Sequence, residues 1–185
     1  MTTDVFLQRS FDTPLTDETF WDMARQSADC LDLYRVGWRE SLMSSDGRRL
    51  VCWFEAPDVE STRLALRKAG SHQGTPWAGT VHDSPVEGAP SADAANVVVE
   101  RSFETPVTLE EIQAIEDAGA SCLESRGVEF VRTLFSRDGK RMVCLYKAPD
   151  AESVREAQRK AGMPVDSIWS FELKAAAPAT PLNNS

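Results

Sequence analysis

Residues 5–14 read VFLQRSFDTP and residues 97–106 read VVVERSFETP, so one pattern returns 92 positions later. Aligning residues 5–70 with residues 97–162 at this constant offset gives about 30 identities in 66 positions without a gap. A period of 92 residues is too long for the repeat unit of a solenoid. The sequence therefore predicts a domain that is present twice.

Each copy predicts the same order of secondary structure. A β-branched run begins the copy as a strand, and Thr108 followed by Glu111 is the capping box that starts a helix. The expected elements of the second copy are a strand from residue 97, a helix with apolar positions Ile112, Ile115, Ala118, Cys122 and Leu123, a hairpin over residues 128–147 turning at Asp138-Gly139, a helix over residues 151–161 and a strand over residues 167–173. The order β-α-β-β-α-β is that of a ferredoxin-like plait.

The predicted hairpin is apolar on both faces. Met142, Cys144 and Tyr146 share one face, and Val143 and Leu145 share the other. An antiparallel sheet with one solvated face alternates apolar and polar residues instead. We therefore expect helices to cover one face and the sheet of the sister copy to cover the other. The predicted fold is α+β: two ferredoxin-like plaits that form an intrachain, pseudo-dimeric α+β barrel.

Composition sets the expected domain boundaries. Residues 83–96 are rich in Pro, Ala, Ser and Gly and have no apolar period, which is typical of a linker. Residues 175–185 read AAAPATPLNNS and predict a disordered tail. The two ferredoxin-like copies are then expected at residues 1–82 and 97–174.

Charge and hydropathy exclude several partners. The 185 residues carry 20 Lys and Arg against 29 Asp and Glu, a net charge of −9, whereas a nucleic-acid-binding surface needs clustered positive charge. No apolar run approaches the roughly 18 residues that span a membrane. The first residues also lack the features of a signal peptide. We expect a cytoplasmic protein with no nucleic-acid or membrane partner.

The cysteines and histidines give a weak case for metal or redox chemistry. Four cysteines lack C-x-x-C spacing and recur in register in the two copies, so we expect buried, reduced core thiols, with a metal or redox pair as the alternative. His72 and His82 are expected at the surface, and the sequence has no nucleotide-binding, zinc-protease or serine-hydrolase motif. We assign no catalytic residue and no metal ligand.

Candidate ligand-binding residues are charged or aromatic side chains within predicted strands. Glu40 and Arg132 occupy equivalent positions with opposite charges, so they can meet about a pseudo-twofold axis. A charged pair inside a barrel is a candidate site for a polar or anionic ligand. The alternative is that such charges lie at strand ends or pair only for structure. The predicted ligand-binding residues are Arg9, Arg101, Glu40, Arg132, Trp38 and Phe130.

The repeated motifs resemble a known family. R-S-F-[DE]-T-P, S-x-D-G-[RK]-R-x-V-C, A-P-D-x-E-S and R-K-A-G are similar to those of the small domains of unknown function that are described as nickel-binding proteins. The resemblance covers both copies, about 150 of the 185 residues. It implies a ferredoxin-like fold that is commonly dimeric, which a tandem chain would build within one polypeptide.

Two classes of function follow. One is a binding protein for a small ligand or a metal, nickel included, built on a dimeric α+β barrel. The other is a cofactor-free enzyme, such as a cyclase, isomerase or monooxygenase, which rests on fold analogy alone. The expected partner is a small molecule or metal ion, and the chain is expected to be a monomer or a homodimer.

Overall fold

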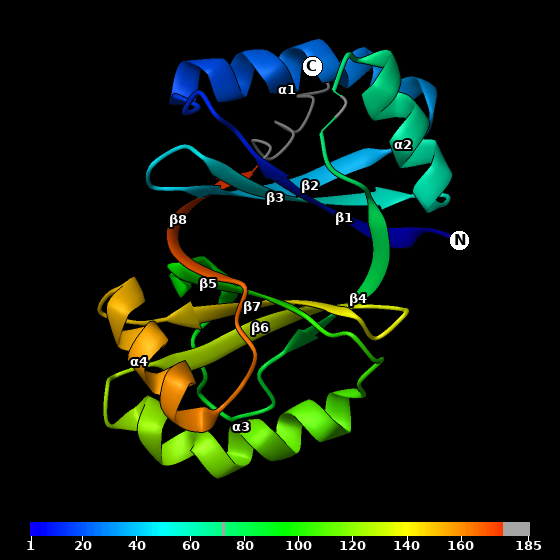
Figure 1. The fold of residues 1–185 in the computed structure, drawn as a ribbon. Coiled ribbons are helices and arrows are strands. Elements are labelled where there is room, and N and C mark those ends of the chain that lie inside the picture. Colours follow the sequence, from blue (N-terminus) through cyan, green and yellow to red (C-terminus); the bar gives the residue numbers. More distant parts are fainter. Residues whose placement is uncertain (72, 176–185) are drawn as a thin grey trace, which may run out of the picture.

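The computed structural model describes residues 1–71 and 73–175, which form two α+β halves (Figure 1). The first half consists of β1 (Thr3–Ser10), α1 (Asp17–Leu33), β2 (Gly37–Ser44), β3 (Arg49–Ala56), α2 (Val59–Lys68) and β4 (Trp77–Asp83). After the short 3-10 helix η1 (Ala92–Ala94), the second half consists of β5 (Val97–Ser102), α3 (Leu109–Glu124), β6 (Glu129–Ser136), β7 (Arg141–Lys147), α4 (Ala151–Ala161) and β8 (Ser167–Ala175). Both halves have the order β-α-β-β-α-β.

All eight strands form one closed barrel. Their order around it is β1-β3-β2-β8-β5-β7-β6-β4. The halves are joined at both edges by antiparallel pairing, β2 with β8 and β4 with β6. The sequence analysis expected two sheets packed face to face. The structure adds that hydrogen bonds between the halves also close the barrel, so neither sheet keeps a free edge.

The molecule has one inner core and two outer cores. The inner core fills the barrel and takes side chains from both halves, including Phe6, Val51, Val143 and Leu145. Each outer core lies between one sheet and its own helices. Figure 1 shows α1 and α2 on one side of the barrel and α3 and α4 on the opposite side. The predicted apolar pattern on both faces of the hairpins is confirmed.

Two equivalent β-bulges change which side chains face the barrel. The pairing of β2 with β3 shifts between Trp38 and Glu40, and that of β6 with β7 shifts between Phe130 and Arg132. A bulge inserts one extra residue and breaks the strict alternation of side chains. Trp38 and Phe130 therefore pack in the outer cores. After the bulges, Glu40 pairs with Trp53 and Arg132 pairs with Leu145, and both partners belong to the inner core.

A polar network crosses between the halves inside the barrel. Gln8 Nε2 donates a hydrogen bond of 2.8 Å to Glu100 Oε1, and these two residues occupy equivalent positions in the repeat. Trp77 Nε1 donates to Gln8 Oε1 at 3.1 Å, and Trp169 Nε1 donates to Glu100 Oε2 at 3.0 Å. Arg49 Nη1 lies 3.1 Å from Glu100 Oε2. The network is thus nearly symmetric in geometry but carries the carboxylate on one side only.

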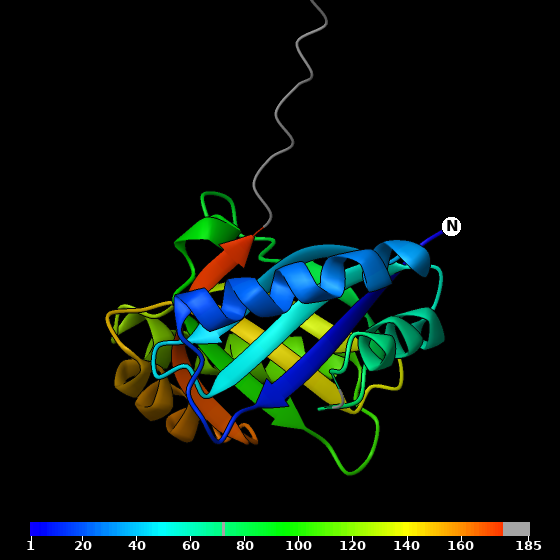
Figure 2. The ribbon, with the colours of Figure 1, turned by 90° about the horizontal axis from the view of Figure 1, so that it is seen from above.

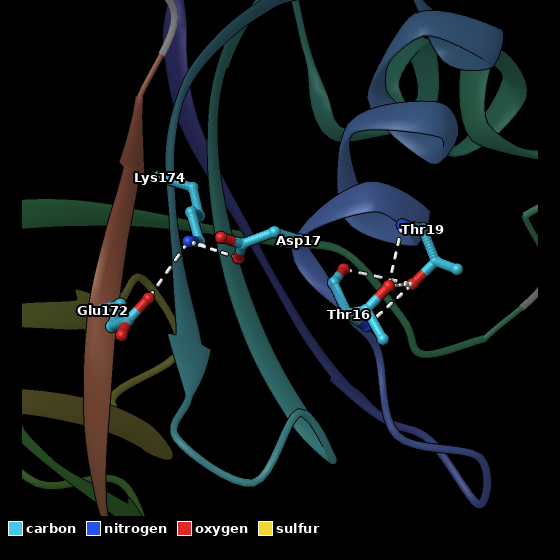
Figure 3. A network of polar contacts seen from close by, with 5 residues as sticks. All are labelled: Thr16, Asp17, Thr19, Glu172 and Lys174. Carbon is cyan, nitrogen blue, oxygen red and sulfur yellow. Dashed lines mark hydrogen bonds and ion pairs between the residues drawn. The ribbon is translucent and has the colours of Figure 1, made fainter.

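The start of α1 is tied to the last strand of the other half (Figure 3). Thr16 and Thr19 form a capping box at the N-terminus of α1. Lys174 Nζ, on β8, donates to Asp17 Oδ1 at 2.7 Å and to Glu172 Oε2 at 3.1 Å. The hydrogen bond to Asp17 raises the pKa of Lys174. This contact fixes the helix that forms one wall of the site described below (Figure 2).

Several expectations need correction. The middle of helix α3 is rotated by one position relative to the predicted apolar stripe. Gly119 faces Ala161 of α4, whereas Ile115 and Ala118, which were predicted to be in the stripe, are exposed. Ala175, which was expected in the tail, pairs with Glu40 and belongs to β8. Residues 176–185 lie outside the described residues. Within the described part of the chain, no helix is both long and apolar enough to cross a membrane.

The cysteines are also less uniform than expected. All four are free thiols, but only Cys52 and Cys144 are buried, whereas Cys30 and Cys122 are half-buried. The second pair lies near the ends of α1 and α3, where the helix face turns partly toward solvent.

Candidate functional site

Figure 2 shows α1 lying over the outer face of the sheet of the first half. A cavity of about 200 Å³ lies between this helix and the sheet. Strands β1, β2 and β3 form its floor and α1 forms most of its roof. Most of its walls are apolar or aromatic, which is typical of small-molecule sites. Its lining includes Phe20, Met23, Ala24, Leu31, Trp38, Phe54 and Leu66, together with the polar residues Arg9, Ser27, Ser41 and Cys52.

Arg9 is the buried charge of this cavity. Its residue is 8% exposed. Its Nη1 donates to Ser71 Oγ at 2.7 Å and its Nη2 donates to Cys52 Sγ at 3.4 Å, while its Nε is buried without a hydrogen-bond partner. Within residues 1–71 and 73–175, no carboxylate lies within ion-pair distance of this guanidinium. The positive charge is therefore surrounded by neutral side chains.

A line of polar groups runs along the floor beside Arg9. Trp38 Nε1 donates to Ser41 Oγ at 3.0 Å, and Ser41 Oγ donates to Cys52 Sγ at 3.1 Å. Cys52 thus accepts from both Ser41 and Arg9. These groups give the cavity one polar side opposite its aromatic walls.

The aromatic walls are packed against one another. Phe20 and Trp21 are 5.2 Å apart between ring centroids, and Trp38 lies 6.1 Å from Phe20 and 5.9 Å from Trp21. Two of these pairs are edge-to-face, a favoured arrangement of aromatic rings. The walls are therefore held in place before any ligand enters.

The second half fills the equivalent region with polar side chains. Arg101 is 1% exposed, and its donors reach Gln158 Oε1 at 2.7 Å, the carbonyl of Pro164 at 3.0 Å and the Tyr146 hydroxyl at 3.3 Å. Glu116, on α3, is close enough for the two charges to interact; burial raises the pKa of Glu116 and the charge of Arg101 opposes this rise. The Nε of Arg101 is buried without a partner, as in Arg9.

Three substitutions between the halves produce this difference. Ala24, Phe54 and Leu66 line the cavity of the first half. At the equivalent positions the second half has Glu116, Tyr146 and Gln158. In the second half the arginine therefore gains hydrogen bonds to Tyr146 and Gln158, whereas Glu116 Oε1 has no hydrogen-bond partner among the described residues.

The second half has a different opening, a groove of about 500 Å³ beside α3. It is lined by residues that include Phe130, Glu116, Thr133 and His82, but Arg101 does not line it. His82 is half-buried rather than exposed as expected, and its Nε2 lies 2.7 Å from Thr80 Oγ1. His72 lies outside the described residues.

The six predicted ligand-binding residues are divided among three places. Arg9 and Trp38 line the cavity of the first half. Arg101 is in the outer core region of the second half, and Phe130 lines the groove there. Glu40 and Arg132 lie at one end of the barrel. Three further residues that line the cavity were not predicted: Phe20, Ser41 and Cys52. A position-by-position comparison of the two copies would have pointed to this region, because Ala24, Phe54 and Leu66 differ from their counterparts in the second copy.

The oppositely charged pair at the barrel end is loose. Arg132 Nη1 lies 3.9 Å from Glu40 Oε1, with side chains that are 15% and 22% exposed. Arg132 instead makes two hydrogen bonds to Asp83, at 2.5 Å and 3.2 Å, and its guanidinium lies 5.7 Å from the ring centroid of Trp53. Burial raises the pKa of Glu40, whereas the hydrogen bond from Arg132 lowers that of Asp83.

No cluster of three or more His, Cys, Asp or Glu side chains suited to a metal ion occurs in the described part of the chain. The polar groups in the cavity of the first half are a guanidinium, hydroxyls and one thiol. This donor set resembles an organic-ligand site more than a metal centre.

The closed barrel with helices on its outside defines an α+β barrel of the kind found in chlorite dismutase. A mutant chlorite dismutase from Candidatus Nitrospira defluvii aligns with a TM-score of 0.50 at 11% identity, over 95% of this chain and 92% of that chain. Another mutant from the same organism aligns with a TM-score of 0.50 at 10% identity, over 92% and 91%. An anthrone oxidase-like protein aligns with a TM-score of 0.46 at 13% identity, over 95% and 92%. At such identities the likeness concerns the fold.

A family model matches part of the second half. Residues 98–170 match the family described as nickel responsive protein SCO4226-like. No protein with a curated description matches the chain.

Proposed function

We propose that this protein binds a small molecule in the cavity of the first half. The observation that carries the proposal is the cavity itself: about 200 Å³, walled by apolar and aromatic side chains, with a few polar groups on one side. A cavity of roughly 150 Å³ in a protein core is already large enough to bind benzene. The site therefore suits a ligand with a body of about one ring.

The difference between the two halves supports this proposal. The repeat predicts the same architecture twice, and we propose that each half is a ferredoxin-like plait, with residues 83–96 as the linker between domains at residues 1–82 and 97–174. The strand orders β4-β1-β3-β2 and β8-β5-β7-β6 support that view. The second half has the larger or more polar residues Glu116, Tyr146 and Gln158 in this region. The first half has Ala24, Phe54 and Leu66 at the equivalent positions, and these line the cavity.

Nickel is suggested by the description of the matched family. The residues do not fit a nickel site well, because no group of three metal-binding side chains is found among the described residues. Imidazole is a preferred ligand of Ni(II), and the chain has two histidines. The described residues therefore do not favour a nickel site.

A cofactor-free enzyme remains the alternative class, because a cavity with a thiol and a guanidinium can also support chemistry. Asp32, the carboxylate at the cavity, is exposed at its rim. A buried general acid or base among the described lining residues is therefore limited to Cys52. This favours binding over catalysis, and turnover of a bound ligand would reverse the preference.

Binding is tested with small probes of one ring. Toluene, benzyl alcohol and benzoate should raise the melting temperature and change the tryptophan fluorescence, to which Trp38 in the cavity wall contributes, because each of them has a body of one ring. Ala24→Leu should reduce this response by occupying the cavity. Ala118→Leu, on the exposed side of α3, is the matched control and should bind as the parent does. Equal binding by parent and Ala24→Leu would contradict the proposed site.

A further inference from the structure

We infer that the ligand is a small aromatic monocarboxylate whose carboxylate pairs with Arg9, an inference that rests on the proposed function. A buried cation is costly unless an anion or a set of hydrogen bonds compensates it. Arg9 is 8% exposed and its acceptors, Ser71 and Cys52, are neutral side chains. A ligand that enters this cavity with a negative charge supplies the missing compensation.

The hydrogen-bonding capacity of Arg9 suits a carboxylate. A guanidinium has five N–H donors. Arg9 uses Nη1 toward Ser71 Oγ and Met23 Sδ and uses Nη2 toward Cys52 Sγ, which leaves Nε–H and the second Nη2 hydrogen without acceptors. Arg132 shows what this edge of a guanidinium binds, because its Nε and Nη2 hold both oxygens of Asp83. A carboxylate in the cavity can accept from the free Nη2 hydrogen of Arg9, whereas Nε has no accessible surface there.

The second half shows the same arginine with a carboxylate of the protein's own. The charge of Glu116 acts on Arg101, and position 116 is equivalent to Ala24. The methyl group of Ala24 leaves space in the cavity where the second half has a carboxylate. A ligand carboxylate in that space would lie near Arg9, as Glu116 lies near Arg101, and would add the direct contact that Glu116 does not make.

The apolar part of the ligand is defined by the remaining walls. Phe20, Trp38 and Phe54 line the same cavity, and Phe20 and Trp38 lie 6.1 Å apart between ring centroids. A flat ring can make edge-to-face contacts with such walls. With about 200 Å³ available, one ring and a carboxylate fit.

The charge of the ligand is tested by comparing benzoate with benzyl alcohol, which has a similar size and no charge. Binding to the full chain is measured by calorimetry and by tryptophan fluorescence at neutral pH. We expect benzoate to bind about tenfold or more tightly, the effect of one charge-assisted pair. Benzylamine, a cation of the same size, should bind more weakly than either.

Two variants of one position separate charge from volume. Ala24→Glu places a carboxylate in the cavity, as in the second half, and should abolish the preference for benzoate over benzyl alcohol. Ala24→Gln has nearly the same volume without the charge; it should weaken the binding of both probes, as Ala24→Leu does, but benzoate should still bind more tightly than benzyl alcohol. Arg132→Gln removes an arginine at the barrel end and should leave binding unchanged. Circular dichroism of each variant verifies that it is folded.

The outcomes separate this inference from the proposed function. If benzyl alcohol binds as tightly as benzoate, the cavity is a small-molecule site but the ligand is not an anion, and the inference is overturned. An equal loss of the benzoate preference in Ala24→Glu and Ala24→Gln would also overturn it. If no probe binds, both the inference and the proposed function fail.

Discussion

At the scale of single residues, the two halves differ most in how they surround the same arginine. Arg9 and Arg101 are both buried, but the first lies in a cavity with apolar walls and the second among Tyr146, Gln158 and Glu116. Replacing a hydrogen-bonding residue by an apolar one removes a hydrogen-bond partner of the arginine and the space that the polar group fills. Such changes convert a filled polar layer into a cavity without altering the backbone plan.

The buried carboxylate of Glu116 should make stability depend on pH. Burial raises its pKa in the folded protein, so the folded state binds this proton more tightly than the unfolded chain. Its contribution is full below the ordinary pKa and is lost as the pH rises through the raised one. Glu116→Gln should therefore gain stability relative to the parent as the pH rises from about 4 to 8. Urea unfolding at several pH values measures this difference.

Glu110→Gln provides the matched control for that titration. Glu110 is exposed on the same helix. Its replacement should leave the pH dependence close to that of the parent. A Glu116→Gln variant whose stability follows the parent at every pH would contradict the buried position of Glu116.

Arg132 should contribute more through Asp83 than through Glu40. Arg132→Gln removes a two-point hydrogen bond at 2.5 Å and 3.2 Å, whereas the distance to Glu40 is 3.9 Å. We expect a loss of about 1–3 kcal/mol, between the values of exposed and buried ion pairs. In double-mutant cycles with Asp83→Asn and Glu40→Gln, the coupling to Asp83 should be larger. A larger coupling to Glu40 would show that the pair at the barrel end is tighter than the structure indicates.

At the scale of elements, bulges and caps decide where side chains point. The bulges in β2 and β6 place Trp38 in an outer core and let Glu40 and Arg132 approach at the barrel end. The capping box of α1 and the contact of Lys174 with Asp17 fix the helix over the cavity. The site therefore depends on contacts that come from both halves.

Lys174→Met tests the contact between β8 and α1. The variant keeps most of the aliphatic side chain and removes the ammonium that bonds Asp17 and Glu172. Because both carboxylates are largely exposed, we expect a loss of about 1 kcal/mol that shrinks at high salt. Chemical unfolding at two salt concentrations measures it. As a control, Lys147→Met, whose exposed side chain lies 3.8 Å from Glu129, should change stability less than Lys174→Met does.

At the scale of the whole molecule, the barrel is symmetric in its strands and asymmetric in its charges. Gln8 and Glu100 meet across the halves, as do Glu40 and Arg132, and each pair occupies equivalent positions in the repeat. Two identical halves would place like residues together at these points. Fusion in one chain permits a complementary pair instead, which joins unlike halves specifically.

Gln8→Glu should destabilise the barrel. It places a second carboxylate 2.8 Å from Glu100, whose side chain is 10% exposed, in the position of an amide donor. We expect a loss of about 1–3 kcal/mol in the free energy of unfolding. Adding Glu100→Gln in the same chain should recover part of this loss, because the amide and the carboxylate then exchange places. If the double variant is as unstable as the sum of the single ones, the two residues are not coupled.

The sequence alone predicted the repeated order of elements, the hairpins and the two apolar faces. These features depend on local patterns: Thr108 with Glu111 for a helix start, Asp138-Gly139 for a turn, and alternating residues such as Val143 and Cys144 for the two faces of a strand. The same patterns could also place Arg9 on the face of Val5 and Leu7. They act over a few residues, so one sequence is enough to show them.

Only the tertiary structure decided where the candidate site lies. The cavity needs Arg9, Ser41 and Cys52 from three strands and Phe20 from a helix, and no local pattern connects residues so far apart in the chain. Strict alternation along the strand would put Glu40 on the same face as Trp38. It fails at the bulge, where one inserted residue changes the face of the residues that follow. Closure of the barrel through β2 with β8 and β4 with β6 depends on backbone hydrogen bonds, which are available to almost any residue and leave no mark in the sequence.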